Sequence, residues 1–109
     1  MADTIVADLA ETIRQRRVVS GDKSYTRQLL EAGPEHCARK FGEEAIETVI
    51  AALGTDSAAL TSEAADVIYH LLVLLEVRGV AWADVEKLLQ GRAGVSGLVE
   101  KAARAPVPS

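Results

Sequence analysis

The spacing of apolar and polar positions along the chain predicts helices almost throughout. Between Thr4 and Arg17, the apolar residues Ile5, Leu9 and Ile13 recur every four residues, as they do on one face of an α-helix. No segment shows the period-two alternation that is typical of a half-buried strand. The pattern therefore predicts an all-α fold.

Residues that begin and end helices divide the rest of the chain. Serine, threonine and aspartate favour helix starts, proline the first turn, and glycine the end. These signals predict helices over residues 24–32, 34–53, 56–78 and 81–92, with Asp84 as a cap for the last. One or two helical turns are expected over residues 98–105 and a mobile tail over residues 105–109.

The length of 109 residues is that of a single domain, spanning residues 1–109. Apolar residues make up 49% of the chain, but so short a chain leaves much of its surface exposed. The segment 56–78 is apolar nearly all round. We therefore expect a helical bundle built around an antiparallel pair, residues 34–53 and 56–78, and completed by dimerisation.

Charge and cysteine content narrow the class of protein. The net charge of −4 argues against nucleic-acid binding, which needs a basic face. Cys37 is the single cysteine, so an internal disulfide is excluded and a reducing compartment fits. The longest apolar run, Val67 to Leu75, is interrupted by His70 and is short for a membrane span. We expect a soluble cytoplasmic protein with no nucleic-acid or membrane partner.

The helix over residues 34–53 carries one acidic stripe. On a helical wheel, Glu43, Glu44 and Glu47 fall within about 60° of Lys40, and apolar residues occupy the opposite side. Taken alone, such a stripe is ordinary, because most amphipathic helices keep a solvated charged face.

The next helix places two acids in an otherwise apolar sequence, Glu63 and Asp66. In an antiparallel pair joined near residue 55, positions whose numbers sum to about 110 lie level. Glu63 then meets Glu47, and Asp66 meets Glu44. Like charges about 4 Å apart repel by roughly 4 kcal/mol at an effective dielectric constant near 20. Such a cluster needs a cation or shared protons.

The chemistry of the ligands favours a hard cation. Carboxylate oxygens suit Mg²⁺, Mn²⁺ or Ca²⁺, whereas zinc prefers nitrogen and sulfur. The Glu-x-x-His pairs of di-iron bundles are absent, because Asp66 follows Glu63 three residues on. Mg²⁺ fits best, since it takes few protein carboxylates and accepts phosphate as a co-ligand.

Two segments, KFGEEAIETVIAAL and SEAADVIYHLLVLL, resemble the paired helices of phosphoribosyl-ATP pyrophosphohydrolases. Their Glu-x-x-Glu and Glu-x-x-Asp motifs mark a wider all-α group of nucleotide pyrophosphohydrolases. The segments SYTRQLLEAGPE and GVSGLVEKAAR make the resemblance specific. The chain departs from the family pattern at residues 91–94, which are often Arg-Arg-Thr-Gly, and at Ala103, often serine.

The resemblance implies hydrolysis of the α–β phosphoanhydride of phosphoribosyl-ATP to phosphoribosyl-AMP and pyrophosphate, the second step of histidine biosynthesis. It implies a homodimer, and a Mg²⁺ site formed by Glu44, Glu47, Glu63 and Asp66. Glu43 or one of those four would orient or deprotonate the attacking water.

Four residues are expected to contact the substrate, each with an alternative reading. Lys40 would bind phosphate or pair with Glu44; Tyr25 would stack on adenine or donate its hydroxyl, or lie in the core. Lys101 and Arg104 would close over the substrate or stay solvated.

His70 would support Asp66 or be a satisfied core histidine. Two other functions stay open: a related nucleoside triphosphate pyrophosphohydrolase, and a non-catalytic helical dimerisation module.

Overall fold

The computed structural model of the protein describes residues 4–19, 21 and 23–93. This part of the chain contains five α-helices and no strand, which confirms the all-α prediction. The expected turns over residues 98–105 and the tail over residues 105–109 lie outside the described residues. The helices are α1 (Ile5–Val18), α2 (Tyr25–Ala32), α3 (Pro34–Leu53), α4 (Ser57–Val77) and α5 (Trp82–Arg92).

The predicted side-chain caps begin three of these helices. Thr4 Oγ1 accepts a hydrogen bond from the amide of Ala7 at 3.0 Å, and Ser24 Oγ accepts one from Arg27 at 3.1 Å. Asp56 Oδ1 accepts from two amides of the first turn of α4. Each cap satisfies backbone donors that have no partner within the helix.

The cap predicted for α5 is wrong. Ala81 occupies the N-cap position, with no side-chain hydrogen bond, and Asp84 lies inside the first turn. An acidic residue there still interacts favourably with the helix dipole. The helix begins earlier because Trp82, its first residue, packs against the core.

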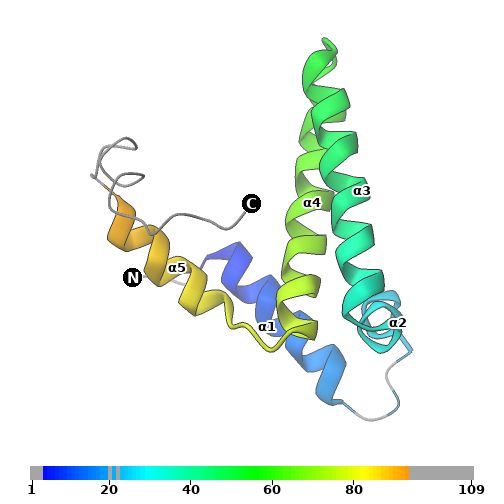
Figure 1. Ribbon diagram of the computed structural model, residues 1–109, viewed down its shortest axis with the longest axis vertical. Helices are drawn as coiled ribbons and strands as arrows, with labels where there is room; N and C mark the ends of the chain where they lie inside the picture. Colours follow the sequence, from blue (N-terminus) through cyan, green and yellow to red (C-terminus); the bar gives the residue numbers. More distant parts are fainter. Residues whose placement is uncertain (1–3, 20, 22, 94–109) are drawn as a thin grey trace, which may run out of the picture.

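The antiparallel pair α3 and α4 dominates the architecture (Figure 1). The two helices run side by side as a long hairpin, joined by residues 54–56. α1 packs on α4, α2 packs against both members of the hairpin, and α5 returns to α1. The hairpin therefore places residues of α3 level with residues of α4.

The core lies toward the end of α4 that is distant from this hairpin turn. It consists of Ile13, Leu29, Leu30, Cys37, Leu72 and Val73. The Cys37 thiol donates a hydrogen bond to Leu29 O at 3.1 Å, and burial raises the pKa of this thiol. Cys37 is thus a small buried residue, and Trp82 and Tyr69 pack against the same core.

Arg27 fastens α2 to the end of α1. Its Nη1 lies 3.0–3.1 Å from the carbonyl oxygens of Arg16, Arg17 and Val19, and its Nε donates to Glu31 at 3.0 Å. The guanidinium group thus satisfies carbonyls that the last turn of a helix leaves without amide partners.

One face of α3 remains uncovered by the described residues. Its members, here termed the apolar strip, are Gly42, Ile46, Val49, Ile50 and Leu53. Ile50 is 64% exposed and Leu53 is 83% exposed. No atom lies within 4 Å of the place where a Cβ on Gly42 would sit. No helix in the described part of this single chain therefore approaches Gly42 closely.

By length and composition alone, α4 is long and apolar enough to cross a membrane. The sequence did not indicate this, because its longest apolar run, Val67 to Leu75, is shorter than the helix. Core helices of soluble proteins pass the same test. α4 contacts α1, α2 and α3 and carries Glu63, Asp66 and the buried His70.

Candidate metal centre

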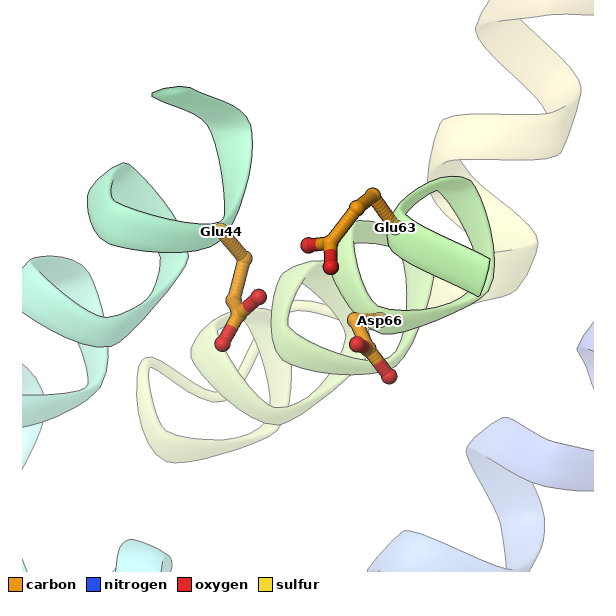
Figure 2. Close-up of side chains that lie close together, drawn as sticks. All are labelled: Glu44, Glu63 and Asp66. Carbon is orange, nitrogen blue, oxygen red and sulfur yellow. The ribbon is translucent and has the colours of Figure 1, made fainter. Parts of the chain in front are cut away.

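Three carboxylates from the two long helices converge. Glu44 extends from α3, while Glu63 and Asp66 extend from α4 (Figure 2). One oxygen of each side chain lies within 4.8 Å of the others. The predicted level pairing of Glu44 with Asp66 is confirmed, because the short connection between α3 and α4 keeps these positions at about the same level of the hairpin.

Two of these carboxylates keep a buried oxygen without a partner. Glu44 Oε2 and Glu63 Oε2 are shielded from solvent and accept no hydrogen bond within the described structure. A buried carboxylate oxygen that has lost its water needs a proton or a cation to compensate. These atoms are therefore free to serve as ligands.

The electrostatic environment raises the pKa of both Glu44 and Glu63 above the ordinary value of 4.5. Loss of solvent is the largest cause for each, and the neighbouring Glu47 is the next. Repulsion from Asp66 adds to both shifts. Glu47 is exposed and stands outside the group of three, yet it lies close enough to act on both glutamates.

The donor set fits a hard divalent cation. It consists of carboxylate oxygens, which Mg²⁺, Mn²⁺ and Ca²⁺ prefer. A positive ion would neutralise the mutual repulsion and would supply partners for the two orphaned oxygens. The acidic cluster is therefore suited to bind a metal ion.

His70 lies at the border between this cluster and the core. The side chain is buried, at 6% exposure, as the core reading predicted. Its Nε2 is 4.0 Å from Glu44 Oε1, which is longer than a hydrogen bond. The nearest carboxylate contact is thus with Glu44, whereas Asp66 was the expected partner. Burial is the main cause that lowers the pKa of His70, and the charge of Lys40 contributes.

Lys40 and Glu43 form an ion pair beside the cluster. Lys40 Nζ is 3.2 Å from Glu43 Oε1. The alternative pairing of Lys40 with Glu44 is wrong, because Glu44 turns toward α4 instead. Glu43 is the main cause that raises the pKa of Lys40, and Tyr25 and Glu44 contribute less.

Tyr25 is 54% exposed, so the reading of this residue as a core tyrosine is wrong. It is the first residue of α2, immediately after the Ser24 cap. Tyr25 contributes to the raised pKa of Lys40, so the two side chains lie within electrostatic range of each other. Lys101 and Arg104 lie outside the described residues.

Thr48 is the polar residue that sequence reasoning missed. Its Oγ1 donates a hydrogen bond to Glu44 O at 2.8 Å and lies 3.2 Å from Glu63 O. It therefore touches the backbones of two residues of the cluster. The sequence feature that could have identified Thr48 is its position in α3. It follows Glu44 by four residues and lies between the acidic stripe and the side of the helix that contacts α4.

The chain matches known proteins over most of its length. A family model described as phosphoribosyl-ATP pyrophosphohydrolase matches residues 6–93, which include both acidic helices. Phosphoribosyl-ATP pyrophosphatase 1 of Bradyrhizobium diazoefficiens is 57% identical over 99 residues, 91% of this chain and 93% of that protein. Phosphoribosyl-ATP pyrophosphatase 1 of Rhodopseudomonas palustris is 54% identical over 104 residues, 95% of this chain and 97% of that protein. The chain therefore belongs to the phosphoribosyl-ATP pyrophosphohydrolase family.

Proposed function

We propose that this chain hydrolyses phosphoribosyl-ATP to phosphoribosyl-AMP and pyrophosphate, the histidine-biosynthesis reaction, with Mg²⁺ held by Glu44, Glu47, Glu63 and Asp66. Family membership supports the reaction and favours an enzyme over a non-catalytic helical module. The convergence of three carboxylates, two of them with orphaned buried oxygens, is the observation that carries the metal site.

The acidic residues have two tasks in this proposal. When bound, Mg²⁺ draws charge from phosphate oxygens and so stabilises the charge that develops during cleavage. Glu44, Glu63 and Asp66 hold the ion from two helices, and Glu47 completes the set from the exposed side.

Water must lose a proton as its oxygen bonds to phosphorus and the α–β anhydride bond breaks. Glu43, Glu44 and Glu47 are the candidates to accept that proton or to orient the water. Glu43 already shares its charge with Lys40, and Glu44 faces α4. Glu47 is exposed beside the cluster, where it can meet a water molecule on the solvent side.

Positive and aromatic groups would bind the rest of the substrate. An ammonium group has three N–H donors, so Lys40 can contact a phosphate while it keeps Glu43 as a partner. Tyr25 is exposed within electrostatic range of Lys40 and offers a ring for adenine and a hydroxyl group. Lys101 and Arg104 are proposed as further phosphate contacts from the C-terminal segment.

A comparison of four candidate substrates tests the proposed reaction. Each assay contains Mg²⁺ and one nucleotide at the same concentration, and it measures the release of pyrophosphate from phosphoribosyl-ATP, dCTP, dUTP or ATP. We expect phosphoribosyl-ATP to have the highest kcat/KM by at least about tenfold, and EDTA to abolish turnover. Preference for dCTP or dUTP would instead support the related nucleoside triphosphate pyrophosphohydrolase.

We also propose that two copies of the chain pair through the apolar strip of α3. The strip is aliphatic apart from Gly42, lacks charge, and is the kind of exposed patch that marks an interface. Gly42 would allow a partner helix to approach closely. Sedimentation should show a dimer for the native chain and a monomer for Ile50→Glu. A folded native monomer at micromolar concentration would contradict this pairing.

The location that fits this function is the cytoplasm. The proposed substrate is a highly charged phosphorylated nucleotide, which does not cross membranes unaided. The buried thiol of Cys37, the single cysteine, is compatible with a reducing compartment.

A further inference from the structure

The hydroxyl group of Thr48 links α3 to α4 at the level of the acidic cluster. It donates to Glu44 O, one turn earlier in its own helix, at 2.8 Å. The same oxygen lies 3.2 Å from Glu63 O on the facing helix. One hydroxyl proton is thus shared between two carbonyls, and both belong to residues that supply an orphaned carboxylate oxygen.

The contact across the helices distinguishes Thr48 from Thr12 and Thr61. Thr12 and Thr61 also donate to the carbonyl four residues earlier, at 3.1 Å and 2.9 Å. Their hydroxyls are exposed, and each of these two bonds stays within its own helix. Such a local bond is common in helices and carries no information about a neighbour. The second carbonyl near Thr48 is what connects two elements.

We propose that Thr48 is a positioning residue that fixes the alignment of α3 against α4, so that Glu44 and Glu63 are held ready for a divalent ion. This inference rests on the proposed metal site. The carboxylates of the two helices repel each other when no ion is present. A hydroxyl that ties their backbones together opposes this separation, because each ligand side chain moves with its own carbonyl. Groups that orient metal ligands typically affect metal affinity by about 10- to 100-fold when removed.

Mn²⁺ titration by calorimetry on the full chain, with no substrate, tests this role. Thr48→Val keeps the shape of the side chain and removes the hydroxyl, and we expect the dissociation constant for Mn²⁺ to rise by about tenfold. Thr48→Ser restores the hydroxyl, and its affinity should return to within about threefold of the native value. Thr61→Val removes the matched local bond and should leave the affinity unchanged.

Each outcome has a defined meaning. Native-like Mn²⁺ affinity in Thr48→Val would overturn the positioning role and leave the metal site standing. Equal losses in the valine and serine variants, both folded by circular dichroism, would also overturn it, because the hydroxyl could not then be the cause. If the native chain binds no Mn²⁺, or Glu44→Gln binds as the native chain does, the metal site itself fails. Should Thr48→Val not fold, Thr48→Ala measured against Thr48→Ser gives the same comparison.

Discussion

Glu44→Gln is expected to lower turnover by at least about a hundredfold, a size typical of a lost electrostatic contribution to catalysis. The glutamine keeps the shape of the side chain but removes one negative charge from a cluster that needs all its charge to hold a cation. The same substitution should raise the melting temperature of the ion-free protein. In that state, loss of solvent and, after it, repulsion from Glu47, Asp66 and Glu63 disfavour the ionised Glu44. Steady-state kinetics and thermal unfolding in EDTA measure the two effects.

A loss of turnover together with a higher melting temperature of the ion-free protein distinguishes a metal ligand from a residue whose role is only structural. Glu35→Gln is the matched control, since Glu35 is an exposed glutamate at the start of α3 whose contact is Arg39 at 3.9 Å. Exposed pairs of this kind contribute little to stability, so both activity and melting temperature should stay near native values. Near-normal rates in alanine variants of Glu44, Glu47, Glu63 and Asp66 would refute the metal site.

Mg²⁺ is expected to raise the melting temperature, and more strongly as the pH rises. The pKa values of Glu44 and Glu63 are raised in the folded chain, so the native state retains protons that the unfolded chain releases. For these groups, stability without the ion therefore falls as the pH rises from the ordinary value of 4.5 through the raised values. Ion binding requires the deprotonated carboxylates, so the affinity for the ion increases over the same pH interval.

Thermal unfolding with Mg²⁺ or EDTA, from mildly acidic to slightly basic pH, measures this linkage. At one hundred times its dissociation constant an ion contributes about 2.7 kcal/mol. For a domain of this size, that corresponds to roughly 10 to 20 °C. The difference should shrink toward zero as the carboxyl groups become protonated. A shift of equal size at all pH values, or one produced equally by K⁺ at matched ionic strength, would contradict carboxylate binding.

The helices were predictable because their boundaries depend on local chemistry. Thr4, Ser24 and Asp56 each satisfy nearby amides, and such bonds need no knowledge of the rest of the fold. The start of α5 was not predictable in this way. Trp82 begins that helix where it can pack against the core, and this tertiary contact outweighs the cap that Asp84 offered.

The position of the acidic cluster was predictable from the sequence, whereas the pairings of the side chains around it were not. A short connection between two antiparallel helices limits their alignment, which brings Glu44 to about the level of Asp66. Lys40, however, has carboxylates both three and four residues ahead, at Glu43 and Glu44. Only the direction of Glu44 toward α4 decides that the lysine pairs with Glu43. Thr48 went unnoticed because its own helix already provides a partner for its hydroxyl.

The core residues of α4 and the acids that it contributes to the proposed metal site occupy different stretches of this helix. Leu72 and Val73 belong to the core, whereas Glu63 and Asp66 stand about two turns away along α4. Substitutions in the acidic stretch can therefore arise during evolution without destabilising the fold. Proteins that keep the hairpin of α3 and α4 can therefore change their phosphate chemistry while they keep the same hydrophobic core.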